Sequence, residues 1–258
     1  MDPAPAIGIG LGFVVVITAN VMEGGNPMSL LLGPPLLLVF GTTILVCIAG
    51  GTMSDAKNMP ASIVRAFTGK VAPASAMIPD VVTLAERARR EGLLALEEAL
   101  TTLEDPFLVK GMTMAIDGTD PEELREILEA EVHAKRSEDR QAAKFFADAG
   151  AYAPTIGIIG TVMGLVHVLE NLAAPAELGH LIAGAFVATL WGVTSANVIW
   201  LPLSSRLKRL GELECDRMEV AIEGIAAIQA GSNPRIIAQK LTSLLPSRER
   251  AVADGEAA

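Results

Sequence analysis

The chain has 258 residues, of which 51% are hydrophobic and 19% are charged. This composition is too apolar for an ordinary soluble domain and too charged for a chain wholly buried in lipid. We therefore expect the apolar residues and the charged residues to lie in separate parts of the structure. The formal net charge of -10 argues against a nucleic-acid-binding protein, because phosphate binding requires a basic surface.

The first 52 residues contain two apolar runs of membrane-spanning length. They cover residues 4–22 and 30–51, and the connection 23–29 has no lysine or arginine. A hydrocarbon core about 30 Å thick requires about 20 helical residues, since lipid offers an open backbone no hydrogen-bond partner. Residues 1–52 are therefore predicted to form a transmembrane hairpin.

Residues 53–152 are predicted to form a helical cytoplasmic domain. The stretch 79–92 has apolar residues at helical spacing, with Asp80 as a candidate N-cap and Gly92 as a stop signal. No alternation typical of a strand occurs anywhere in the chain, so the predicted fold class is all-α.

A second helix of this domain is predicted from residues 119–132. Thr119 or Asp120 is positioned to cap it, and Pro121 falls in the first turn, where a proline is tolerated. We expect this helix to continue into the following apolar run as one long rod. Such a rod would couple the cytoplasmic domain mechanically to the membrane.

The remaining spanning runs lie in residues 153–204, at 153–173 and 181–203, and their short connection also lacks lysine and arginine. The chain is thus predicted to be a polytopic membrane protein with four transmembrane helices in two hairpins and a helical cytoplasmic domain. The alternative, a soluble bundle with four apolar core helices, is disfavoured by the length of the runs.

The distribution of basic residues predicts the orientation in the membrane. Twelve lysines and arginines lie between Lys57 and Lys144, and the other eight lie between Arg206 and Arg250. By the positive-inside rule these segments are cytoplasmic and the two short connections are external. Residues 205–258 are then a cytoplasmic C-terminal helix and tail, and both termini lie inside.

The second hairpin is rich in small residues at helical spacing. They are Gly157, Gly160 and Gly164 in its first helix and Ala188 and Gly192 in its second. Small residues allow helices to approach closely in a membrane, so close helix packing is the simplest interpretation of this pattern.

Two threonines and two prolines in the same hairpin allow a functional interpretation. Thr161 and Thr189 can present hydroxyls to a polar path between helices, because a threonine hydroxyl can bond its own backbone when dry and solvate an ion or water when needed. Pro154 and Pro202 lie near the cytoplasmic ends of the two helices, where a proline marks either an ordinary helix boundary or a hinge.

Enzyme motifs are absent from the sequence. There is no phosphate loop, dinucleotide fingerprint, GxSxG or metal-ligand spacing. His133, His167 and His180 fall in a cytoplasmic helix, a spanning run and an external connection, which is poor geometry for one site. A channel, motor or scaffold without cofactor or metal is therefore favoured over an enzyme.

Four stretches, in order, resemble the MotA/PomA family of flagellar motor stator subunits over nearly the whole chain. They read ARREGLLALEE, EDPFLVKGMTMAIDGTDPEELREILEAE, YAPTIGIIGTVMGLVHVLENL and AELGHLIAGAFVATLWGVTSANVIWLPLSSRL. The related ExbB/TolQ family shares the last two spanning helices but lacks a first hairpin before the large cytoplasmic region.

The resemblance implies an ion-driven rotary stator in the inner membrane. Five copies of such a subunit surround the single spanning helices of two MotB-like partners, whose aspartate takes up and releases the ion, and rotation passes to the rotor protein FliG. The second hairpin would line the partner, and the first would face lipid. The residues expected to pack around the partner are Gly157, Gly160, Gly164, Ala188 and Gly192.

The resemblance also assigns roles to individual residues. Pro154 and Pro202 match the family's two functional prolines, and Thr161 and Thr189 match threonines of its ion path. Many members have two threonines where this chain has Ala188 followed by Thr189, and fewer hydroxyls favour H+ over Na+ as the coupling ion. The residues that match the family's rotor-binding charges are Arg89, Arg90, Glu97 and Glu98.

Two other functions stay open from the sequence alone. One is an ExbB/TolQ-like proton channel that energises envelope or outer-membrane processes. The other is a membrane scaffold without ion flux.

Overall fold

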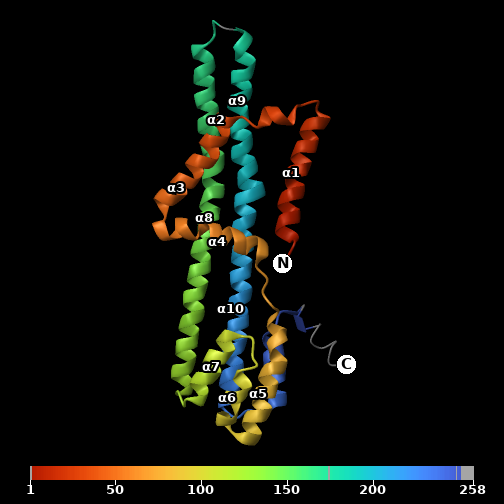
Figure 1. Ribbon diagram of the computed structural model, residues 1–258, viewed down its shortest axis with the longest axis vertical. Helices are drawn as coiled ribbons and strands as arrows, with labels where there is room; N and C mark the ends of the chain where they lie inside the picture. Colours follow the sequence, from red (N-terminus) through yellow and green to blue (C-terminus); the bar gives the residue numbers. More distant parts are fainter. Residues whose placement is uncertain (1, 174, 248, 251–258) are drawn as a thin grey trace. The chain divides into compact units, whose positions relative to one another are not determined.

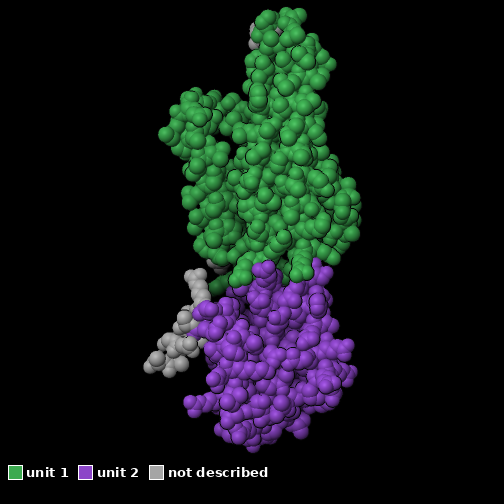
Figure 2. Space-filling model, turned by 180° about the vertical axis from the view of Figure 1, so that it is seen from behind, with its two compact units in different colours: residues 1–70, 139–209 green, residues 71–138, 210–258 purple. Residues whose placement is uncertain are grey.

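The computed structural model describes residues 2–173, 175–247, 249 and 250. All regular elements within these residues are helices, which confirms the all-α fold class. The chain divides into two compact units: unit 1 contains residues 1–70 and 139–209, and unit 2 contains residues 71–138 and 210–258 (Figure 2). Unit 1 thus includes residues 53–70 and 139–152, which we had assigned to the cytoplasmic domain.

Four helices in the described part of the chain are long and apolar enough to cross a membrane. The first, α1 (Ala4–Met22), has the predicted bounds, and none of its residues is buried within the chain. The second begins at Gly33 rather than at residue 30, after a 3-10 turn. Pro34 and Pro35 lack N–H groups and so fit only the first turn of a helix, which sets this start.

The second spanning helix is not a uniform α-helix. It consists of α2 (Gly33–Leu36), a π-helical segment (Leu37–Gly41) and α3 (Thr42–Gly50). It is followed by α4 (Met53–Thr68), which lies across the direction of the spanning helices of unit 1 (Figure 1). Arg65 of α4 forms a bidentate ion pair with Asp139, whose side chain is only 7% exposed.

The second hairpin is formed by α8 (Pro121–Glu170) and α9 (Pro175–Thr194). The predicted external connection 174–180 is largely helical, because Pro175 suits a first helical turn and Glu177 complements the helix dipole there. The helix continues through a π-helical segment (Ser195–Trp200) into α10 (Leu201–Gln229).

The predicted rod is confirmed as the single 50-residue helix α8. At its start the Asp120 carboxylate accepts a hydrogen bond from the backbone N–H of Glu122 at 2.9 Å, as expected for a cap. Asp80, in contrast, does not cap α5 (Ile78–Glu91): the N-cap position is Met77, and no side chain caps the helix. Gly92 does end α5, with a φ of +86° that favours glycine.

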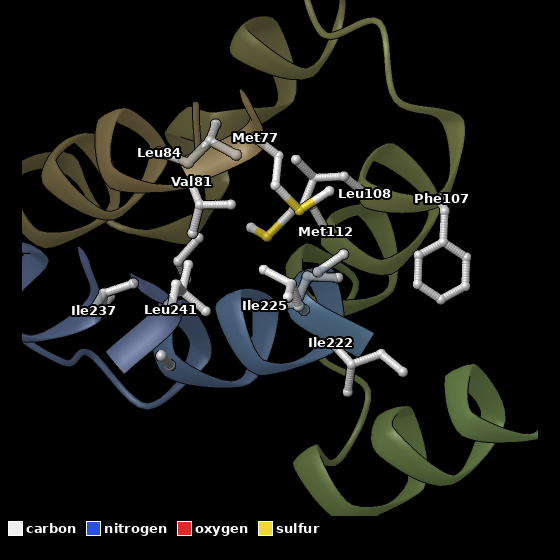
Figure 3. Close-up of a cluster of buried hydrophobic side chains, with 14 of the residues drawn as sticks. Met77, Val81, Leu84, Phe107, Leu108, Met112, Ile222, Ile225, Ile237 and Leu241 are labelled. Atoms are coloured by element: carbon white, nitrogen blue, oxygen red, sulfur yellow. The ribbon is translucent and has the colours of Figure 1, made fainter. Parts of the chain in front are cut away.

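Unit 2 has a conventional hydrophobic core. Helices α5, α6 (Leu96–Leu100), α7 (Pro106–Ile116) and α11 (Pro234–Leu244) contribute to it together with parts of α8 and α10. Figure 3 shows side chains of α5, α7, α10 and α11 meeting there, including Val81, Met112, Ile225 and Leu241. Residues 251–258 of the predicted C-terminal tail lie outside the described residues.

Candidate functional site

The backbones of α8 and α9 approach closely where glycines face each other in unit 1. A Cβ atom on Gly157 would lie 2.9 Å from the carbonyl oxygen of Ala188, and one on Gly192 would lie 2.6 Å from that of Ala153. Because both neighbours are backbone atoms, no side-chain movement could accommodate a larger residue at either position. The predicted close packing of this hairpin is therefore present here.

Gly160 and Gly164 extend the same contact. A Cβ on Gly160 would lie 2.6 Å from the Cβ of Ala188, and a Cβ on Gly164 would lie 2.6 Å from that of Ala185. The structure places these small residues between α8 and α9 of one chain. Their packing around a partner stays a prediction.

A pair of threonine hydroxyls lies in this hairpin contact. Thr161 Oγ1 and Thr189 Oγ1 are within hydrogen-bond distance of each other. Thr161 Oγ1 also lies 3.2 Å from the carbonyl oxygen of Gly157 and 3.1 Å from that of Ala185, and Thr189 Oγ1 lies 3.2 Å from that of Gly157. Two hydroxyl protons thus have several alternative acceptors, so the hydrogen bonds can rearrange locally.

The segments that surround these hydroxyls in the spanning helices have no ionisable residue. Residues 153–166 and 181–203 contain no Asp, Glu, Lys, Arg or His. The threonine pair is half-buried and can solvate an ion or a water molecule. Hydroxyls carry no charge, so the pair cannot by itself neutralise a cation.

The sequence reasoning missed an open apolar face on α8, which points away from the glycine contact. Ile158, Val162, Leu165 and Leu169 recur at intervals of three or four residues, so they share one face, and each is at least 41% exposed. The periodic spacing of these large residues was the available signal. This face is free to contact another helix or lipid.

Pro202 follows a change of helical register. In the Ser195–Trp200 segment the N–H of Leu201 bonds to the carbonyl of Ala196, five residues back instead of four. Where the helix returns from π to α hydrogen bonding, one backbone carbonyl is left without an N–H partner. Proline is suited to this position because it has no N–H group to donate. The Asn197 side chain, within the π segment, donates a hydrogen bond at 2.9 Å to the carbonyl of Val193.

Pro154 lies within α8 and leaves the carbonyl of Gly150 without its usual partner. A Cβ on Gly150 would lie 2.7 Å from the side chain of Leu201, the residue before Pro202. Pro154 thus lies one turn beyond this contact on its helix, and Pro202 lies directly after it on the facing helix. This location agrees with a hinge as well as with a local irregularity, since π segments and prolines both bend helices.

The four predicted rotor-binding residues are all exposed in unit 2, but they do not share one helix. Arg89 and Arg90 lie in the last turn of α5, and Glu97 and Glu98 lie in the first turn of α6. Gly92 ends α5 between them. The charges thus lie on either side of a turn rather than along a continuous helix face.

Arg87, which we had not singled out, distinguishes the two glutamates. Its guanidinium pairs with Glu98 at 2.9 Å and with Glu91 at 3.2 Å. Within the described part of the chain, Arg89 and Glu97 form no ion pair. Arg90 also forms no ion pair there, but its Nε donates to the carbonyl of Glu86 at 3.4 Å. Of the four residues, Arg89 and Glu97 are therefore the two whose side chains make neither an ion pair nor a hydrogen bond within the described part of the chain.

Known proteins resemble this chain in both sequence and fold. Residues 99–220 match the model of the MotA/TolQ/ExbB proton channel family. The chain is 37% identical to Motility protein A of Bacillus subtilis over 97% of its own length and 93% of that protein. It also resembles the flagellar MotAB stator complex of Bacillus subtilis, with a TM-score of 0.90, 36% identity, and 97% and 98% of the two chains covered. The MotAB structure of C. jejuni matches with a TM-score of 0.91, 29% identity, and 96% and 97% covered.

Proposed function

Because this chain belongs to the MotA family of motility proteins, we propose that it is a flagellar motor stator subunit that forms an ion channel with a MotB-like partner. It is a protein of the inner membrane and belongs to a family of channel subunits. The proposed complex converts the free energy of ion flow into torque on the rotor.

The single observation that carries the mechanism is the threonine pair, which lies in spanning segments (residues 153–166 and 181–203) that contain no ionisable residue. Thr161 and Thr189 supply hydroxyls, and the carboxylate that takes up the ion is supplied by the partner's spanning helix. An ionised carboxylate that faces the apolar side chains of the spanning helices raises the free energy of the complex, whereas a protonated, neutral carboxyl raises it much less. Ion binding therefore changes which part of the surrounding helix surface the partner helix can face, and this change drives a rotational step.

The open face of α8 is the surface we assign to that partner. Its large apolar side chains, from Ile158 to Leu169, are exposed, and the small residues behind them hold α8 rigidly against α9. In the proposed assembly, five copies surround two partner helices, so that each copy presents this face in turn. Both termini are cytoplasmic, as the distribution of basic residues indicates.

Torque is passed on through the exposed charges around Gly92. Arg89 and Glu97 have no ion-pair partner within the described chain and are offered to FliG, while Arg90 and Glu98 belong to the same patch. Exposed ion pairs contribute only about 0–1 kcal/mol each, so such contacts form and break rapidly as the ring turns.

Replacing either threonine tests the role of the hydroxyls. Thr161→Val and Thr189→Val keep the shape of the side chain but remove the hydroxyl, and we expect each to reduce swimming speed at normal membrane levels. Thr161→Ser and Thr189→Ser keep the hydroxyl and are expected to retain most of the speed. Equal swimming of the valine and serine variants would argue against an ion path along this pair.

The coupling ion is proposed to be H+. Ala188 precedes Thr189, so only one hydroxyl is provided at that step of α9, which suits a proton better than a partly dehydrated sodium ion. Swimming speed is expected to be independent of sodium concentration at constant pH. A speed that follows sodium under these conditions would show that Na+ is the coupling ion.

An envelope-energising channel of the ExbB/TolQ type is less well supported. The family model spans both types, but the full-length relatives named Motility protein A also match the first hairpin. A pure scaffold is less well supported, because the family model that the chain matches is one of proton channels.

A further inference from the structure

A groove of about 490 Å³ runs between α1 and the Ser195–Trp200 π segment within unit 1. Gly8 and Gly12 of α1 form one wall, and Val198 and Leu203 form the other. Among the described residues that line the groove, Arg206 is the one with a charge. The groove is thus an apolar channel along membrane-spanning segments with a cation at one end.

Not all hydrogen-bond donors of the Arg206 guanidinium have a partner within the described part of the chain. Its Nη2 atom donates to the carbonyl of Gly69 at 3.1 Å and forms an ion pair with Asp2 at 2.8 Å. Its Nε atom is buried and has no hydrogen-bond partner in the described part of the chain. Asp2 is more exposed than Arg206, with 38% against 18% of the side chain accessible, so the ion pair can be displaced from the Asp2 side.

We propose that this groove binds an anionic glycerophospholipid, with its phosphate on Arg206 and one acyl chain along α1 and the π segment. The walls belong to spanning helices, so lipid is the medium that surrounds the opening, and an empty apolar channel would forfeit dispersion contacts. Arginine suits phosphate because its planar guanidinium presents paired donors, and basic residues at the cytoplasmic surface attract anionic lipids. In the orientation proposed above, this lipid belongs to the inner leaflet.

Asp2 and the π-to-α transition near Pro202 would both influence lipid binding. Asp2 competes with the phosphate for Arg206, so the start of α1 limits lipid binding. The acyl chain packs beside Val198 and Pro202, where the helix returns from π to α register. The bound lipid would therefore support the hairpin at its least regular point.

The test uses the full complex of this chain with its cognate partner, purified in mild detergent and incubated with micelles containing phosphatidylglycerol or phosphatidylcholine. Bound phospholipid is measured by native mass spectrometry. We expect Gly8→Leu to lose both lipids, because its side chain fills the groove. Gly10→Leu is the matched control: Gly10 is equally open on α1 but does not line the groove, so binding should be unchanged.

The headgroup contact is tested by two variants with opposite expected effects. Arg206→Gln should weaken phosphatidylglycerol binding by about tenfold and leave phosphatidylcholine little changed, since a charge-assisted contact is lost. Asp2→Asn should strengthen phosphatidylglycerol binding. The proposal is overturned if Gly8→Leu and Gly10→Leu bind equally, whether both retain or both lose lipid, or if neither headgroup variant alters the preference for phosphatidylglycerol. A photoreactive side chain at position 8 that attaches to a second copy of the chain, instead of to lipid, would also overturn it.

Discussion

Replacing Gly192 by leucine is expected to abolish swimming. The added side chain would meet the backbone carbonyl of Ala153 and the Cα of Gly157, neither of which can move without separating α8 from α9. Overpacking in a well-packed contact costs about 1–3 kcal/mol and occasionally more. Separation of the two helices would also break the Thr161–Thr189 contact. The measurement is swimming speed together with the thermal unfolding midpoint of the purified complex.

Gly179→Leu is the matched control on the same helix. A Cβ at Gly179 meets no heavy atom within 4 Å, so the larger residue has room. We expect this variant to swim at nearly the normal speed and to unfold at the normal temperature. If Gly192→Leu behaved in the same way, the tight α8–α9 contact would not be needed for function.

Reversing the charges of Arg89 and Glu97 together is expected to stop rotation while leaving the protein in the membrane at its normal level. Both residues are exposed and free of ion pairs in the described chain, so their replacement costs the fold little. The double variant Arg89→Glu, Glu97→Lys would present the wrong sign to FliG at both positions, and like charges in an interface oppose association. Swimming and membrane abundance are the quantities to measure.

Arg235→Glu provides the control for charge reversal, because Arg235 is also exposed in unit 2 but lies at the start of α11. It should swim normally. Compensating charge reversals on FliG should restore part of the speed of the double variant. Normal swimming of the double variant would remove Arg89 and Glu97 from the rotor contact.

The sequence was most informative where a local signal determines the structure. The uniform apolarity of α1 predicted its bounds, since spanning length depends only on composition. Gly92 ended α5 as expected, because a positive φ is a local requirement that glycine meets. The continuous helix α8 followed from the cap at Asp120 and the absence of any strong break before Pro154.

The sequence was less informative where the outcome depends on which surfaces meet. The spacing of Gly157 and Gly192 predicted close packing but not that the neighbour is a helix of the same chain. The π segment before Pro202 depends on competition between backbone registers, and a proline alone signals only an irregularity. The ion pair between Arg87 and Glu98 forms across a turn whose geometry the sequence does not specify.

The most direct test of the central claim is the swimming of motor-competent cells that carry this chain with its cognate MotB-like partner, either protein alone, or this chain with a partner whose membrane aspartate is changed to asparagine. If this chain is the wall of the ion path and the partner holds the ion, only cells with both unaltered proteins should swim. Swimming without this chain, or with the asparagine partner, would contradict the proposed division of roles.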